Sequence, residues 1–173
     1  MNKSLSLLAA LLLPFVLFAC SDSTLDAETA IAPRATIATL DVYKSATCGC
    51  CDAWITHMEE AGFEALTHNS DDLNQVKVEY GIAARYQSCH TAVSQDGYIF
   101  EGHVPAPYVQ AFLENPPADA IGLAVPGMPM GSPGMQIGEN FTPYQIWLLK
   151  EDGRSEIFVS VENSEQQYRA DGI

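Results

Sequence analysis

The amino-acid sequence predicts a mixed α/β fold, and three observations support this class. Short β-rich segments alternate with helical segments in the order strand, helix, strand, helix, hairpin, helix. The pair Asp96-Gly97, typical of a tight hairpin turn, separates two of the β-rich segments. Apolar residues also recur at helical spacing after Asp52. The 173 residues of the chain suffice for one domain with a substantial hydrophobic core.

The first elements flank a group of cysteines. Residues 39–44 alternate in polarity and are rich in β-formers, which predicts the first strand. Residues 45–51 are expected to form a turn, and Asp52 to begin a helix that ends at Gly62. His57 is expected on the outward face of this helix. Its inward face is predicted to carry four apolar residues: Trp54, Ile55, Met58 and Ala61.

The remaining elements complete a sandwich of thioredoxin type, which we assign to residues 39–117. A strand is predicted at 63–68 and a helix at 71–80. A hairpin at 91–101 and a second helix at 107–114 follow. Residues 81–113 also resemble the C-terminal half of thioredoxin in their rhythm. In that comparison His90 occupies the position where thioredoxins have a cis-proline.

The composition changes after residue 117. Residues 118–162 are predicted to form a Gly/Pro/Met-rich loop and a C-terminal β-hairpin that pack on the thioredoxin-like domain. The segment 122–135 is expected to be a loop without regular structure, and the hairpin to pair 144–149 with 156–161. Residues 163–173 are predicted to be a polar tail.

The N-terminal segment predicts export. Residues 1–19 contain an apolar run that is too short to span a membrane comfortably, which is typical of a signal peptide. The sequence Leu-Phe-Ala-Cys at 17–20 resembles a bacterial lipobox, so we expect cleavage before Cys20 and acylation of that cysteine. An ordinary signal peptide cut near Ala19 is the alternative, and both interpretations export the protein. Ser21 favours anchoring at the outer membrane, facing the periplasm.

Charge and composition limit the classes of partner that the protein is expected to bind. Residues 20–38 are polar and small, which predicts a flexible tether between the lipid anchor and the domain. The chain has 8 basic and 22 acidic residues, a net charge of −14. Cleavage of residues 1–19 removes one basic residue, Lys3, so the net charge of the mature chain is −15. Nucleic acid is excluded as a partner, because binding to phosphates requires Lys and Arg. Membrane contact is expected through the lipid anchor only.

Four cysteines besides Cys20 carry the predicted chemistry. Cys48, Cys50 and Cys51 fall within four positions between a predicted strand and a helix start, and Cys89 lies further along the chain. A helix N-terminus favours the thiolate form, which is both the metal ligand and the redox nucleophile. The cluster therefore suits metal binding and thiol chemistry alike.

Three interpretations of these thiols are open. Structural disulfides could join Cys48 to Cys51 and Cys50 to Cys89, as exported proteins allow. A thiol–disulfide oxidoreductase would use the Cys48-x-x-Cys51 pair at a helix start. A metal site would use all four thiols. Adjacent Cys50 and Cys51 suit bridging of several soft ions better than one tetrahedral zinc, and soft sulfur ligands select Cu(I).

Methionine and histidine residues add further candidate ligands. Met128, Met130 and Met135 lie in the Gly/Pro-rich loop, where they could bind Cu(I) or fill gaps over the domain. His90 follows Cys89 directly and His103 follows the predicted hairpin, so both are candidate copper ligands. The two other histidines, His57 and His68, are expected at the surface.

Four motifs in the same order resemble the DUF411 family, whose copper-resistance members are called CopG. The motifs span about residues 39–150 and are listed here by position: Cys48-Gly49-Cys50-Cys51, Ser88-Cys89-His90-Thr91, Gly97-Tyr98 with Glu101-Gly102-His103-Val104-Pro105, and the run from Gly122 to Met135. The resemblance implies a thioredoxin-like fold, periplasmic export, copper binding by the cysteines and a role in copper resistance.

The expected function is thus a periplasmic copper-binding protein that holds Cu(I), with more than one ion in the cysteine site. Sequestration and interconversion of Cu(I) and Cu(II) are both compatible with it, and the second would make the protein a copper oxidoreductase. A periplasmic copper chaperone or a redox partner would be the matching protein partner. The alternative of a different class is a thioredoxin-like oxidoreductase that uses Cys48 and Cys51.

Overall fold

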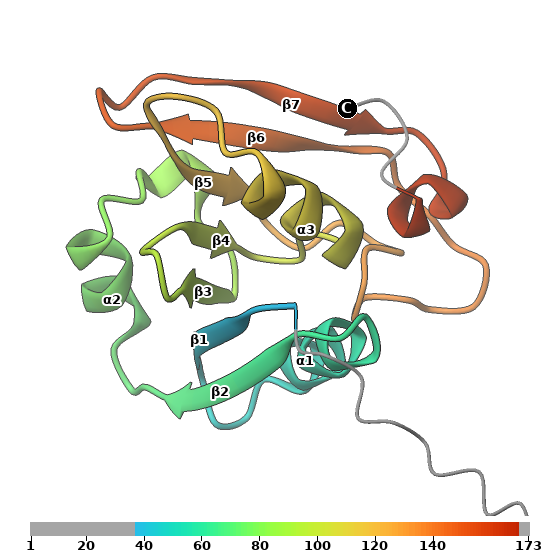
Figure 1. Ribbon diagram of the computed structural model, residues 1–173. Helices are drawn as coiled ribbons and strands as arrows, with labels where there is room; N and C mark the ends of the chain where they lie inside the picture. Colours follow the sequence, from blue (N-terminus) through green and yellow to red (C-terminus); the bar gives the residue numbers. More distant parts are fainter. Residues whose placement is uncertain (1–36, 170–173) are drawn as a thin grey trace, which may run out of the picture. The chain divides into compact units, whose positions relative to one another are not determined.

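The computed structural model describes residues 37–169, which form a mixed α/β fold around one seven-stranded sheet (Figure 1). The sheet order is β2-β1-β3-β4-β5-β6-β7, from β2 at the bottom of the view to β7 at the top. The strands are β1 (Thr39–Lys44), β2 (Glu64–Asn69), β3 (His90–Ser94), β4 (Ile99–Glu101), β5 (Ala120–Ala124), β6 (Tyr144–Lys150) and β7 (Ser155–Val161).

In the described residues, three α-helices and one short 3-10 helix connect the strands, and a second 3-10 helix follows β7. They are α1 (Gly49–Glu60), α2 (Leu73–Glu79), α3 (Ala106–Glu114), η1 (Ala84–Tyr86) and η2 (Ser164–Tyr168). The predicted signal peptide, the predicted lipidation site Cys20 and the part of the predicted tether up to residue 36 lie outside the described residues. In the described part of the chain, no helix has the length and apolar character needed to cross a membrane.

Strand directions follow from the lengths of the connections. β1 and β2 run parallel because α1 carries the chain back between them, and β4 and β5 are parallel for the same reason, with α3 as the crossover. Short turns make β3–β4 and β6–β7 antiparallel, which confirms both predicted hairpins. β1 also pairs with β3 in antiparallel register, so Lys44 lies opposite His90.

Helices cover both faces of the sheet. Trp54, Ile55 and Met58 of α1 are buried, as the helical spacing predicts, in a core cluster that also contains Tyr108, Val109 and Phe112 of α3. A smaller cluster on the other face includes Ile82 and Tyr86, from the segment that follows α2. The core therefore fixes the start of α1 against the middle of the sheet.

Helix α1 begins earlier than predicted. It starts at Gly49 rather than Asp52, so Cys50 and Cys51 belong to its first turn and not to a preceding loop. The amide of Asp52 already donates to the carbonyl of Cys48 at 3.2 Å, which marks Cys48 as the N-cap. The prediction was wrong because it relied on an acidic cap, whereas Cys48 caps without any side-chain hydrogen bond.

The prediction of a loop without regular structure at 122–135 is also wrong for its first residues. Ala120–Ala124 form strand β5, which lies between β4 and β6. A Cβ atom on Gly122 would lie 1.9 Å from the carbonyl oxygen of Ile99, so only glycine permits this close approach of two strands. In a Gly/Pro-rich sequence the same glycine weakened the strand signal.

The segment predicted as a polar tail contains η2, whose Gln167 is fully buried. Its side-chain oxygen accepts a hydrogen bond from the Tyr144 hydroxyl at 2.8 Å, and its nitrogen donates to the Gly131 carbonyl at 3.0 Å. These two bonds tie the end of the described chain to β6 and to the methionine-containing loop.

His57 is half-buried, contrary to its predicted place on the surface, while His68 is exposed as expected. The N-terminus of α3 packs over His57, and the amide of Ala106 donates to its Nε2 at 3.0 Å. Burial lowers the pKa of His57 from 6.5 to about 4. The fold therefore holds this ring in its neutral form.

We expect His57 to make the protein less stable in mild acid. The unfolded chain takes up a proton on this residue as the pH falls below 6.5, whereas the folded chain resists until about 4, so stability is lost across that interval. Replacement by Gln keeps an acceptor for Ala106 but removes the titration. Urea unfolding between pH 7 and 4 should show a shallower loss of stability for His57→Gln than for the wild type. Equal slopes, with His68→Gln as control, would contradict this.

Candidate metal centre

Four cysteines converge where the start of α1 meets the start of β3. Cys48 caps α1, and Cys50 and Cys51 lie in its first turn. Cys89 immediately precedes His90, which pairs with Lys44 at the end of β1. The ligand atoms of all four cysteines lie within 4.8 Å of one another. Sheet register thus brings together residues 38 positions apart, from Cys51 to Cys89.

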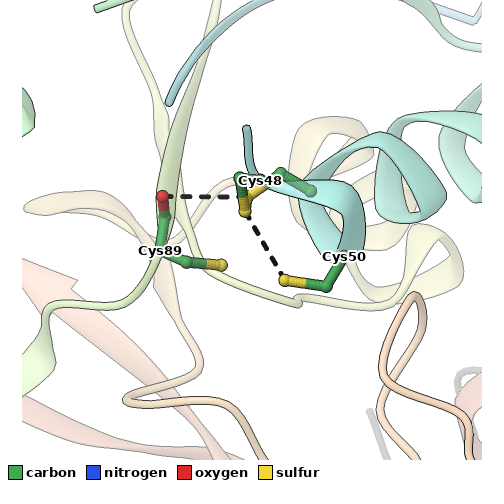
Figure 2. A group of neighbouring side chains, drawn as sticks. Cys48, Cys50 and Cys89 are labelled. Atoms are coloured by element: carbon green, nitrogen blue, oxygen red, sulfur yellow. Dashed lines mark hydrogen bonds between the residues drawn. A yellow bond between two sulfur atoms is a disulfide. The ribbon is translucent and has the colours of Figure 1, made fainter. Parts of the chain in front are cut away.

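The structure holds the centre in an oxidised state. Cys48 and Cys51 form a disulfide, whereas Cys50 and Cys89 are free thiols. Figure 2 shows Cys50 and Cys89 directing their sulfur atoms toward the same space beside the disulfide. The Sγ of Cys50 lies 3.5 Å from that of Cys48, and the Sγ of Cys51 lies 3.8 Å from the Cys89 carbonyl oxygen. Reduction of the bridge would provide four thiols in one cluster.

The Cys89 thiol is held neutral by its surroundings. Burial raises its pKa to about 12, and the nearby Cys50 adds to the rise. A thiol that keeps its proton is a poor nucleophile but becomes a strong ligand when a metal displaces the proton.

His103 turns a lone pair toward Cys89. Its Nδ1 is 2.8 Å from the carbonyl oxygen of Pro133, which can only accept a hydrogen bond, so Nδ1 carries the proton. Its Nε2 therefore accepts, and it lies 3.0 Å from the Sγ of Cys89. Burial also lowers the pKa of His103, in favour of the neutral ring. A backbone carbonyl that orients a neutral imidazole in this way is typical of metal-binding histidines.

His90 lies on the other side of Cys89 and is fully buried. Its Nδ1 is 3.4 Å from the Cys89 Sγ, and its ring packs 4.4 Å from the Trp54 ring and 5.0 Å from that of His103, centroid to centroid. Its Nε2 is buried without a hydrogen-bond partner among the described residues. Burial, with His103 and Lys77 nearby, keeps the pKa of His90 well below its usual value.

The loop that carries the methionines closes against this centre. Ser88 Oγ donates to the Gly127 carbonyl, and the Gly127 amide donates to the Gln87 carbonyl at 3.2 Å. Further along, Gly134 packs on the first turn of α1, where an added Cβ would lie 2.6 Å from the Cys50 carbonyl oxygen. Pro133, between these contacts, orients His103. The loop is thus fixed to the strand, the helix and the histidine of the site.

Two of the three loop methionines project into solvent. Met128 is 54% exposed and Met130 is 43% exposed, while Met135 is half-buried. Gap filling in the core therefore does not account for Met128 and Met130.

Sequence reasoning missed a buried ion pair behind the site. Lys77 of α2 and Glu101 of β4 are almost completely buried, and Lys77 Nζ lies 2.6 Å from Glu101 Oε1. The Glu101 carboxylate also accepts from the Ser88 amide at 2.5 Å and from the Thr91 hydroxyl at 2.6 Å. It therefore holds both residues that flank the Cys89-His90 pair. Glu101 lies in a motif that resembles the family, but the sequence gives no signal that connects it to Lys77.

We expect this pair to be essential for stability. Lys77→Met would leave the Glu101 carboxylate buried without its counter-ion, so the free energy of unfolding should fall by about 3–5 kcal/mol. Lys150→Met removes a more exposed lysine, which pairs with Asp119 and Glu156, and should cost less than about 1 kcal/mol. Chemical denaturation measures both changes. A similar small loss for the two variants would show that the buried pair adds nothing beyond a surface pair.

Comparison with known proteins gives two independent similarities. The sequence model of DUF411, described as a protein family of unknown function, matches residues 86–135. Two solved structures described as copper resistance protein copG, form 1 and form 2, are each 41% identical to this chain with a TM-score of 0.68. The similarity covers 72% of this chain and 97% and 98% of theirs. No curated protein matches the sequence.

Proposed function

Since this chain is a member of the DUF411 family of CopG-like proteins, we propose that it is an exported copper-resistance protein that holds Cu(I) in its cysteine cluster. The observation that carries this proposal is the convergence of Cys48, Cys50, Cys51 and Cys89, whose sulfur atoms all lie within 4.8 Å of one another. Thiolates are soft ligands and select Cu(I) over hard cations.

The arrangement favours more than one copper ion. Cys50 and Cys51 are adjacent on α1, where successive side chains point about 100° apart. These two thiolates and that of the N-cap Cys48 are poorly placed to bind one tetrahedrally coordinated ion together. Each of the two can instead bridge neighbouring ions. We therefore expect a thiolate-bridged cluster rather than a single mononuclear site.

The observed disulfide supports a redox role for the same cluster. Closing the Cys48–Cys51 bridge from two thiolates releases two electrons, enough to reduce two Cu(II) ions to two Cu(I) ions. Opening the bridge takes up two electrons from a redox partner. The thiols that bind copper can thus also change its oxidation state, in addition to sequestering it.

The cellular setting follows from the N-terminal sequence. Residues 1–19 direct export to the periplasm, and Cys20 anchors the protein to the outer membrane by its lipid, with a tether reaching to residue 38. A periplasmic copper chaperone or a redox partner would then meet the cluster there. The fold that we propose for 39–117 is thioredoxin-like, supported by the order β2-β1-β3-β4 and by the disulfide at the start of α1, with 118–162 packed on it.

A thiol–disulfide oxidoreductase is the second candidate, and the disulfide itself favours it. Cys48 is half-buried and Cys51 is fully buried, so an incoming thiolate would reach Cys48 first. Cys50 lies 3.5 Å from the Cys48 sulfur, where it would compete for a mixed disulfide at Cys48. This third thiol therefore counts against simple thiol exchange with a substrate, and metal binding is the function that the cluster suits better.

We expect the fully reduced protein to bind more than one Cu(I) ion per chain. Anaerobic titration against a chromophoric Cu(I) chelator measures the stoichiometry. Cys50→Ser removes one bridging thiolate and should lower the number of bound ions, whereas the control Thr56→Ser, on the exposed side of α1, should leave it unchanged. Weak copper binding combined with efficient reduction of a disulfide substrate would favour the oxidoreductase instead.

We further expect the loop methionines to assist copper transfer, as a lid or as the place where copper enters. Changing Met128, Met130 and Met135 to Leu keeps their apolar volume but removes three thioethers. Transfer of Cu(I) from a chelator to this variant should be slower or weaker than to the wild type. Met58→Leu, in the core, serves as control. Unchanged affinity and loading rate would assign the loop methionines no part in copper handling.

A further inference from the structure

We infer that the open edge of strand β2 is an interaction surface, and that its partner is the same edge of a second copy of this chain. The two β2 strands pair in antiparallel direction about a two-fold axis at Leu66, and the two sheets join into one continuous sheet. This inference concerns self-association and does not depend on the proposed copper function.

Half of the backbone groups of β2 point away from the sheet. β2 and β7 are the two edges of the sheet in residues 37–169, and Figure 1 shows β2 at its lower edge. The amides of Glu64 and Ser70 donate toward β1, to the carbonyls of Ala38 and Lys44, at 2.9 Å each. Because successive residues of a strand direct their N–H and C=O groups to alternate sides, the intervening residues face outward. These residues are Ala65, Thr67 and Asn69.

β2 lacks the features by which natural sheets protect an open edge. It contains no lysine or proline, and it pairs with β1 along all six residues without a bulge. Its side chains are mostly exposed, and Leu66 at its centre is 45% exposed. The ladder of the other edge strand, β7, has a register shift between Ile146 and Trp147. β2 is therefore the edge that is better suited to pair with another strand.

The side chains of β2 favour one register of this pairing. Residues with outward backbone groups must lie opposite one another, so the two-fold axis passes through a residue rather than between two. With the axis at Leu66, Ala65 hydrogen-bonds with Thr67 of the second copy, and Leu66 faces Leu66. Glu64 then faces His68 of the second copy, a carboxylate opposite an imidazole. An axis at Ala65 would instead place Glu64 against Leu66, and an axis at Thr67 would place Leu66 against His68.

Both polar side chains of this register are already held in place. The Thr39 hydroxyl donates to Glu64 Oε2 at 2.8 Å. His68 Nε2 lies 2.6 Å from Asp41 Oδ1, and the His68 ring stacks on Tyr43 with 5.0 Å between centroids. Since Asp41 engages Nε2, the contact to Glu64 of the second copy uses Nδ1. Side chains that are ordered beforehand lose less freedom on association.

The contact is expected to be weak in free solution. The mature chain has a net charge of −15, so two copies repel each other until salt screens their charges, over roughly 8 Å at physiological ionic strength. The lipid anchor that we propose at Cys20 confines all copies to one membrane surface and raises their effective concentration. Weak pairing of the β2 edges is then sufficient for association at the membrane.

Analytical ultracentrifugation of the mature chain tests the inference. Cys20→Ser prevents lipidation, a reductant excludes disulfides between copies, and the salt concentration is physiological. We expect an equilibrium between monomer and dimer below millimolar concentration. Leu66→Lys places two like charges opposite each other and should raise the dissociation constant at least about tenfold. Ile157→Lys, at a comparably exposed position of β7, should leave it unchanged.

A charge exchange tests the register. His68→Glu places carboxylates opposite each other and should weaken the dimer, whereas the double variant Glu64→His/His68→Glu restores a pair of opposite character and should recover it. A double variant no better than His68→Glu alone would overturn the register centred on Leu66.

Two results would refute association through β2 itself. One is a wild-type chain that stays monomeric up to millimolar concentration, which would leave the edge to a strand of another protein. The other is a dimer that Ile157→Lys dissociates and Leu66→Lys does not, which would place the contact at β7. Circular dichroism of each variant verifies that loss of association is not loss of fold.

Discussion

The buried Glu101 carboxylate is the interaction on which the geometry of the site depends. It lies on β4 and accepts hydrogen bonds from the Ser88 amide and the Thr91 hydroxyl, while Lys77 of α2 neutralises its charge. These contacts fix the backbone on both sides of Cys89 and His90 from the face of the sheet opposite α1. Burying two charges is costly unless each is fully paired, so this network also makes the local fold intolerant of change.

On the other face, the same backbone presents its side chains to α1. The antiparallel register of β1 and β3 places Cys89 beside the first turn of the helix, where Cys50 and the disulfide lie. Exclusion of water keeps the imidazoles of His90 and His103 neutral and leaves the Cys89 thiol protonated. Such a centre has little tendency toward free thiolate chemistry, but neutral imidazole and thiol are the forms that a soft metal ion converts into ligands.

The methionine-containing loop joins the two halves of this arrangement. Through Gly127 it contacts the residues before Cys89, through Pro133 it orients His103, and through Gly134 it packs on α1. Gln167 of η2 binds the Gly131 carbonyl and so secures the loop from the end of the described chain. Residues far beyond the cysteines in sequence thus determine how rigidly the site is held.

The sequence predicts the class of fold, both hairpins, the buried face of α1 and a set of candidate ligands, because helical spacing, turn pairs and cysteine clusters are local patterns. It does not predict the correct start of α1, because Cys48 caps the helix without a side-chain hydrogen bond. It also gives no clear signal for β5, because Gly122 weakens the strand pattern while it permits the close contact of two strands. Only the tertiary structure shows that Lys77 reaches Glu101, that Pro133 orients His103 and that His90 is buried against Trp54. These are contacts between residues distant along the chain, and they depend on sheet register and on the exclusion of water, which no local pattern records.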